Sequence, residues 1–293
     1  MADVDQILLV LVPISIVGAV LNWSSFYSIC KLTSYKHSFG YLSANQALAD
    51  ALHSTIFLLY FCPMALLDHS FLKQYSHFCG FILLFFYELS IMTHLAVSFK
   101  RFFSIWFPVI FKKHFDVPRT KVVIGVLWCY TLIQATVLYE VLCYFYFDEE
   151  IRFLTFTKTP FCAIIGTYGD FLKNTVIVTF MMSVDILNLI KVKVKSYQIK
   201  NTLTNAAIEK LSCRDRRFLR QTIIQGSVYM LGMITYFFTP IYFENRWILF
   251  FGTSFSWVAV HVADGLILLI CNPEIRHYIF HVKTNVQVAT VTM

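Results

Sequence analysis

The sequence predicts an all-α membrane protein, a seven-transmembrane helix bundle with its N-terminus outside the cell and its C-terminus in the cytoplasm. Hydrophobic residues make up 58% of the 293 positions and charged residues only 14%, a composition unlike that of soluble proteins. A bilayer therefore has to be the solvent for most of the chain. We expect a single seven-helix domain, residues 1–293, with no room for a separate soluble domain.

Seven apolar segments support this architecture, because each is long enough to cross a membrane. About 20 apolar residues in a helix, each rising about 1.5 Å, span the ~30 Å hydrocarbon core. The segments cover approximately residues 7–30, 41–66, 78–105, 122–147, 168–190, 219–243 and 248–271. We expect the remainder, residues 272–293, to form a short cytoplasmic tail with an amphipathic helix lying on the membrane.

The positive charges set the expected orientation, because Lys and Arg accumulate in cytoplasmic loops. Of the 24 Lys and Arg residues, 19 follow the first, third and fifth segments or lie in the tail. This bias places the N-terminus outside. The net charge of +7 is then explained by topology and by contact with membrane lipids, and we expect no nucleic acid as a partner.

The third segment is the expected centre of the bundle. Cys79 and Arg101 are separated by roughly 33 Å of helix, about one bilayer core. Between them Glu88, Thr93 and His94 bring polar groups to membrane depth, which is costly unless those groups face other helices or a cavity. This helix should therefore be buried among the others.

Carboxyl groups also lie inside other spans, with no Lys or Arg expected near mid-membrane to pair with them. These acids are Asp50, Glu88, Glu140, Asp185 and Asp264. Removal from water favours the neutral, hydrogen-bonded form of such groups. Two His–Asp combinations are spaced three residues apart and share a helix face, Asp50 with His53 and His261 with Asp264.

The cysteines suggest one disulfide on the outer side. Cys79 opens the third span and Cys162 lies in the long loop after the fourth, both facing the oxidising side of the membrane. A Cys79–Cys162 bridge is the natural pairing, the alternative being two unrelated thiols. Cys143 falls within an apolar span, where a thiol behaves as a small hydrophobe.

Several polar residues and prolines occur together in a pattern known from one superfamily. They are Asn22, the run Leu42 to Asp50, Cys79, Arg101, Pro240 and Asn272-Pro273. The chain in this respect resembles the rhodopsin-like G-protein-coupled receptors. Further runs, Phe39-Gly40, Tyr87-Glu88-Leu89-Ser90-Ile91, Thr93-His94-Leu95 and Arg101-Phe102, are similar to those of the nematode serpentine chemoreceptors of class X.

The resemblance implies a chemosensory receptor in which an external ligand shifts the helix bundle and opens a cytoplasmic cleft for a heterotrimeric G protein. It assigns switch and coupling roles to Arg101, Asp50, Pro240, Asn272 and Pro273. It also implies a polar cluster, which would contain Asn22, Asp50, Asp264 and Asn272. The family often holds a sodium ion beside the residue that matches Asp50; a neutral cluster without metal is the alternative.

The chain departs from the superfamily pattern at the inner end of the third helix. Where an acid usually precedes the arginine, this sequence reads Lys100-Arg101-Phe102, so Arg101 has no neighbouring acid. Arg220 of the sixth segment is expected to face Arg101, and repulsion between the two would weaken the inactive state. We therefore expect appreciable basal activity.

An aromatic pocket is expected at the depth where such receptors bind small ligands, because Glu88 lies roughly 13 Å below Cys79 along the helix. Its predicted lining, which could equally be packing in the core, consists of Tyr87, Glu88, Ile91, Tyr236, Phe237, Tyr242 and Trp257. The ligand should be a small molecule or a short peptide, since the outer loops are too short to hold a protein.

Other classes fit the sequence less well. A retinal-binding protein is excluded because the seventh segment has no lysine for a Schiff base. No HExxH or GxSxG motif occurs. An intramembrane protease would need paired acids at mid-depth, and the suggestive run Gly166 to Asp170 lies at the outer edge of the membrane. A transporter or channel of unknown substrate is the alternative function. We expect no enzyme activity, no cofactor, and a multi-pass location in the plasma membrane, in particular that of a sensory cilium.

Overall fold

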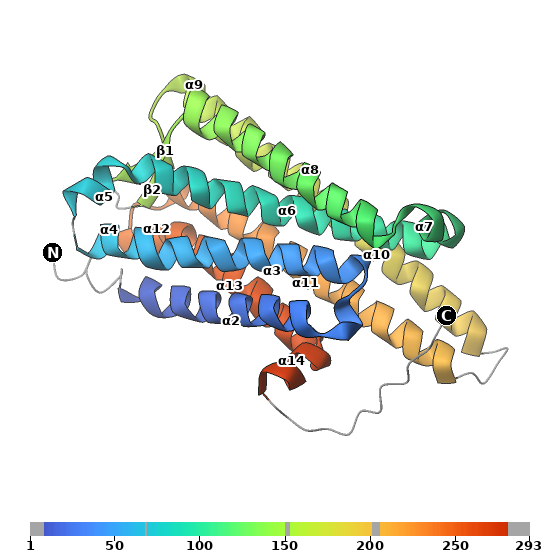
Figure 1. Ribbon diagram of the computed structural model, residues 1–293. Helices are drawn as coiled ribbons and strands as arrows, with labels where there is room; N and C mark the ends of the chain where they lie inside the picture. Colours follow the sequence, from blue (N-terminus) through green and yellow to red (C-terminus); the bar gives the residue numbers. More distant parts are fainter. Residues whose placement is uncertain (1–8, 68, 150–152, 201–205, 281–293) are drawn as a thin grey trace.

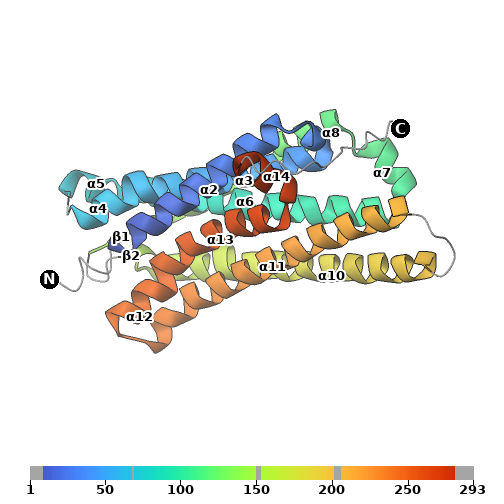
Figure 2. The ribbon, with the colours of Figure 1, turned by 90° about the horizontal axis from the view of Figure 1, so that it is seen from below.

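The computed structural model describes residues 9–67, 69–149, 153–200 and 206–280. Its long helices run roughly along one common axis, so that the molecule is an elongated bundle (Figure 1). The short elements α4, α5, α9 and α12 and both β-strands lie at one end of the bundle, and α7 lies at the opposite end (Figure 2). We call these the hairpin end and the α7 end.

The first half of the chain forms three long segments. The elements are α2 (Leu11–Lys31), α3 (Ser38–Ile56), α4 (Cys62–Leu66), α5 (Ser70–Gln74), α6 (Ser76–Trp106) and α7 (Pro108–His114). A π-helical stretch, Phe57–Phe61, joins α3 to α4 without a break. The expected central helix is confirmed, because 67% of the apolar window of α6 is buried against 17% for the segment Val117–Leu142.

The second half contributes four further segments and the tail helix. The elements are α8 (Val117–Thr136), β1 (Phe145–Asp148), β2 (Phe153–Phe156), α9 (Pro160–Ile164), α10 (Lys173–Lys200), α11 (Ala206–Tyr242), α12 (Arg246–Phe250), α13 (Ser256–Cys271) and α14 (Pro273–Phe280). Three more π-helical stretches, Val137–Leu142, Ile165–Leu172 and Phe251–Phe255, extend these helices toward the hairpin end. Such stretches are frequent at functional sites.

Six helical segments of the described chain are long and apolar enough to span a membrane. The remaining long helix, α11, has 37 residues and packs against α10 and α13, but Gln221, Gln225 and several Tyr and Thr residues lower its hydropathy. It lies alongside the six others in the bundle (Figure 2). The seven-helix fold predicted from the sequence is thereby confirmed.

The end of the fourth segment was predicted wrongly. The helix ends at Leu142, and the following aromatic run, expected to be helical to residue 147, forms β1 of an antiparallel hairpin with Phe145 opposite Phe156. Aromatic residues fit a pleated strand as readily as a helix. The hairpin lies against α6, where a Cβ on Gly80 would come within 2.0 Å of the Phe145 carbonyl oxygen, and Phe147 N donates to Ser76 Oγ.

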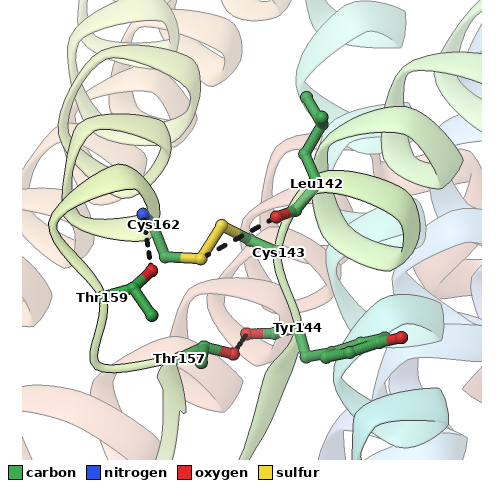
Figure 3. The surroundings of a disulfide bond; sticks show 6 residues. All are labelled: Leu142, Cys143, Tyr144, Thr157, Thr159 and Cys162. Carbon is green, nitrogen blue, oxygen red and sulfur yellow. Dashed lines mark hydrogen bonds between the residues drawn. A yellow bond between two sulfur atoms is a disulfide. The ribbon is translucent and has the colours of Figure 1, made fainter.

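The disulfide also differs from the prediction. Cys162 pairs with Cys143 (Figure 3). The predicted partner, Cys79, is a free thiol with 1% exposure inside α6. The two errors have one cause: because the helix ends at Leu142, Cys143 leaves the apolar span with extended backbone directly before β1. The hairpin then brings the chain back so that the Cα atoms of Cys143 and Cys162 are 5.6 Å apart.

The tail begins with α14, which turns away from the direction of the bundle and packs against α2 (Figure 2). Ile275 is completely buried, whereas Tyr278 is 39% exposed and its ring lies 6.4 Å from that of Tyr27. Residues 281–293 of the predicted tail lie outside the described part of the chain.

Candidate functional site

A cavity lies inside the bundle near the hairpin end, between α6, α11, α13 and β1. It encloses about 390 Å³ of space not filled by protein atoms, including the part open to solvent. Four residues expected from the sequence to line a pocket border this cavity: Tyr87, Tyr236, Phe237 and Trp257. The aromatic lining is typical of small-molecule sites.

The rings around the cavity form a connected aromatic set. Trp257 is at its centre, with ring centroids 6.2 Å from Tyr87, 6.0 Å from Tyr236 and 5.6 Å from Phe145. The hydroxyl of Tyr236 donates to the carbonyl oxygen of Leu154 in β2 at 2.7 Å. The hairpin therefore closes the cavity on one side and is tied to α11.

Three residues predicted for this lining lie elsewhere. Ile91 is buried further along α6 with 1% exposure, and Tyr242, at the end of α11, is 72% exposed. Glu88 is fully buried beside the cavity but does not border it. Successive residues of a helix point in different directions. Because Tyr87 faces the cavity, its neighbour Glu88 faces the stretch Val137–Leu142 and the start of α10.

Glu88 has a cationic partner, which corrects the expectation that no basic residue reaches the buried acids. Lys173, the first residue of α10, binds Glu88 Oε1 at 2.5 Å. The same oxygen accepts hydrogen bonds from Tyr139 (3.2 Å) and Asn174 (3.0 Å). The side chain of Lys173 is 23% exposed and reaches Glu88 from the start of α10.

Asp170 is a residue of the cavity lining that was expected at the outer edge of the membrane. The fifth helix begins at Pro160 rather than at Tyr168, so Asp170 lies within it, 5% exposed. Its Oδ1 accepts from Asn174 at 2.9 Å. The run ending at Gly169-Asp170 had drawn attention to this acid, but the predicted start of the fifth helix was too late to place it inside the bundle.

A second polar region occupies the middle of the bundle. Asp50 of α3 is 1% exposed, and its Oδ1 lies 2.8 Å from His261 Nδ1 of α13 and accepts from Ser90 of α6, also at 2.8 Å. The Ser90 hydroxyl is 2.7 Å from that of Tyr229, a residue that also borders the cavity. Three helices thus meet at one carboxyl group, and α11 joins them through Ser90.

Asp264 has an equivalent arrangement with His94. Its Oδ2 lies 2.8 Å from His94 Nε2 and accepts from Gln46 at 3.1 Å. Both His–Asp pairs therefore connect different helices, so the pairing within one helix suggested by the three-residue spacing does not occur. His53 instead stacks on His261, with ring centroids 3.7 Å apart.

The four residues of the predicted polar cluster fall into two hydrogen-bonded groups, which lie next to each other along α13 at His261 and Asp264. Asn22 donates to the His261 carbonyl oxygen at 2.9 Å. Asn272 donates to Gln221 at 2.9 Å and accepts from Tyr35 at 3.2 Å. Gln221 bonds Gln225, whose amide donates to the Asp264 carbonyl oxygen at 3.5 Å. Asn272 is therefore linked to Asp264 through two glutamines.

The remaining predicted switch residues lie at opposite ends. Pro240 is in the last turn of α11 at the hairpin end, next to Thr239, against which Gly252 packs so closely that a Cβ would lie 2.3 Å from Thr239 Oγ1. Pro273 starts α14 directly after Asn272. Pro240 thus lies two residues before the end of α11, and Pro273 lies between α13 and α14. The roles of both prolines as switches stay predictions.

Arg101 is held by neutral acceptors of α11. Its guanidinium donates to the Phe218 carbonyl oxygen and to Thr222 Oγ1, both at 2.8 Å, and lies 5.6 Å from the centre of the Phe218 ring. This contact joins α6 to α11. Arg220, expected to face Arg101, has an exposed side chain.

A sodium ion near Asp50, one of the two alternatives that the family resemblance leaves open, would have to share that carboxyl with His261 and Ser90, which already contact Oδ1. In the described part of the chain, no group of three or more His, Cys, Asp or Glu residues is arranged to hold a metal ion. The sodium site stays a prediction.

The comparisons with known proteins agree with this architecture. The family profile described as "Serpentine type 7TM GPCR chemoreceptor Srx" matches residues 12–272. Serpentine receptor class X 45 of Caenorhabditis elegans is 25% identical, covering 91% of this chain and 78% of that protein. Serpentine receptor class X-43 of the same organism is 23% identical, covering 85% of this chain and 78% of that protein.

Among solved structures, the crystal structure of squid rhodopsin superposes with a TM-score of 0.76 at 16% sequence identity, covering 96% of this chain and 85% of the other. At this identity the likeness concerns the fold alone.

Proposed function

Given that the chain belongs to the Srx family of serpentine seven-helix chemoreceptors, we propose that this receptor binds a small external ligand in the cavity near the hairpin end and activates a heterotrimeric G protein at the α7 end. It is a multi-pass membrane protein and not an enzyme. One observation carries the proposal: two groups of buried polar contacts, adjacent along α13 at His261 and Asp264, extend from the cavity toward the other end of the bundle.

The path starts at Tyr229, which borders the cavity and contacts Ser90. Ser90 donates to Asp50, and Asp50 contacts His261. A ligand that moves Tyr229 would change the hydrogen bonds of one carboxyl shared by three helices. Buried polar groups tolerate few arrangements, because each unsatisfied group is costly, and this favours switching between discrete states.

The second half of the path lies on α11. Gln225 and Gln221 connect the Asp264 backbone to Asn272, and one turn away Thr222 holds Arg101. A displacement of α11 relative to α6 would break the Arg101 contacts and free the guanidinium. We propose that this release creates the surface that the G protein recognises.

The orientation follows from charge in this proposal. The hairpin end faces the outside and the α7 end the cytoplasm, where Lys112, Lys113 and His114 close α7 with positive charge. The disulfide at the hairpin end is consistent with an oxidising environment. We place the receptor in the plasma membrane, in particular that of a sensory cilium.

The test is expression of the full chain with a second-messenger reporter and a panel of small environmental chemicals and short peptides. An active compound should lose potency with Phe237→Trp, because the larger side chain fills the cavity. It should keep its potency with Phe238→Trp, because the Phe238 side chain is 39% exposed and does not border the cavity. Arg101→Ala should abolish the response while the protein still reaches the surface.

Two results would contradict the proposal: a response that persists in Arg101→Ala, or a surface-expressed receptor that responds to nothing in the panel and shows no basal nucleotide exchange on added G protein. A solute flux that depends on the protein and not on a G protein would favour the transporter or channel reading instead.

A further inference from the structure

The only charged group on the cavity lining, within the described residues, is the carboxyl of Asp170. It is 5% exposed, and Oδ1 accepts one hydrogen bond, from Asn174 at 2.9 Å. Its second oxygen, Oδ2, has no hydrogen-bond partner among the described residues. Because this oxygen keeps some exposure at the cavity and meets no protein donor among the described residues, it can accept a hydrogen bond from a ligand.

The charges beside the cavity do not balance. Asp170 and Glu88 share the amide of Asn174, which donates to Glu88 Oε1 at 3.0 Å and to Asp170 Oδ1. Lys173 supplies one positive charge to this group, and its ammonium is bound to Glu88. Two carboxyl groups therefore share a single cation, and the uncompensated one is the one that borders the cavity.

The walls around Asp170 are aromatic rather than polar. Tyr87, Tyr236 and Trp257 border the same cavity, and ring faces attract cations through their quadrupole. Stabilisation of a cation by such rings increases when water is excluded. The lining thus combines one unsatisfied carboxyl oxygen with several ring faces.

We propose that the cavity takes a small organic cation, a compact amine in its protonated form, anchored by the carboxylate of Asp170 and surrounded by Tyr87, Tyr236 and Trp257. This deepens the proposed function and rests on its choice of the cavity as ligand site. An ammonium group would give Oδ2 its missing donor and balance the second carboxylate. A neutral ligand leaves that charge uncompensated, and an anion meets repulsion from Asp170 and Glu88.

Three probes of the same shape and different charge test the proposal. The full chain in lipid nanodiscs is titrated at neutral pH with 2-phenylethylammonium, 2-phenylethanol and phenylacetate, up to millimolar concentration, with binding followed by calorimetry and by the shift in Tm. The ammonium should bind about tenfold or more tightly than the alcohol, and phenylacetate should bind least.

The variant Asp170→Asn should remove the preference for the ammonium over the alcohol. Asp185→Asn is the matched control, because Asp185 is a buried acid of the same membrane segment but accepts from Ser98 away from the cavity. It should keep the preference. The comparison among the three probes on the unaltered receptor stays decisive if Asp170→Asn does not fold.

Equal binding of the alcohol, tighter binding of phenylacetate, no binding of any probe, or a preference that survives Asp170→Asn would each overturn the proposal. The proposed receptor function fails separately: a neutral or anionic compound that activates the reporter and loses potency with Phe237→Trp would leave the receptor function intact and refute only the cation.

Discussion

The two buried polar regions of the bundle differ in how their carboxyl groups are partnered. In the central network each of two carboxyl groups, Asp50 and Asp264, has its own histidine from another helix. Beside the cavity two carboxyl groups, Glu88 and Asp170, share one lysine. Matched groups hold a structure together, whereas an unmatched group at a cavity is available to something that enters it.

The central network should respond most strongly to mutation. Asp264→Asn leaves His94 without its carboxyl partner at a site with no exposure, and loss of one member of a buried pair costs about 3 kcal/mol or more. Equilibrium unfolding in nanodiscs should show this loss in the free energy of unfolding. A change below about 0.5 kcal/mol, the usual effect of an uninvolved surface site, would mean that the pair is not matched in the way described.

The disulfide should have the next largest effect, and it acts on the cavity side alone. Cys143 and Cys162 are 19 positions apart, and a bridge over a loop of about this length contributes about 3 kcal/mol. Cys143→Ser should therefore lower Tm and increase proteolysis of the hairpin. Cys79→Ser, the variant of the free thiol, serves as control, and mass mapping that instead finds Cys79 bridged to Cys162 would refute the assignment.

A smaller effect is expected at the contact between Arg101 and Thr222 near the α7 end. Thr222→Val removes one acceptor of Arg101 and should weaken the α6–α11 contact by about 1 kcal/mol. Such a change raises the population of the released state about fivefold, and basal second-messenger signalling should rise accordingly. Thr222→Ser retains the hydroxyl and should behave as the unaltered receptor; equal basal signalling from all three would rule out this role for the contact.

The smallest and most informative change is Asp170→Asn in the absence of ligand. Because it removes an uncompensated buried charge, it should leave the free energy of unfolding unchanged or raise it by up to about 1 kcal/mol. The same substitution at Asp264 is destabilising, so the two variants measured side by side test the contrast directly. A loss at Asp170 as large as that at Asp264 would remove the distinction between the two regions.

The features set by composition and hydropathy could be predicted from the sequence. The seven segments, the central position of the third helix and the family resemblance follow from long apolar runs and from local motifs such as Tyr87 to Ile91. Part of the cavity lining could be anticipated as well, because Tyr87, Tyr236, Phe237 and Trp257 lie at comparable depth on neighbouring helices.

Features that depend on helix ends and helix rotation could not be predicted. The run Tyr144 to Phe147 is apolar and fits either a helix or a strand. Because it was predicted to be helical, Cys143 was placed inside the membrane and was not considered as a disulfide partner. A late start for the fifth helix hid Asp170 in the same way. The pairing of Asp50 with His261 rather than with His53 depends on how two helices face each other, and spacing within one helix does not contain this information.

The receptor account requires that the hairpin end, and with it the cavity, faces the outside of the cell. Labelling with a membrane-impermeant maleimide tests this most directly, using Lys158→Cys near the hairpin, where the side chain is 61% exposed, and Lys112→Cys in the exposed part of α7. The account predicts that Lys158→Cys is labelled on intact cells and Lys112→Cys only after permeabilisation, with the unaltered receptor as background. The reverse pattern would contradict it, because the cavity would then open toward the cytoplasm.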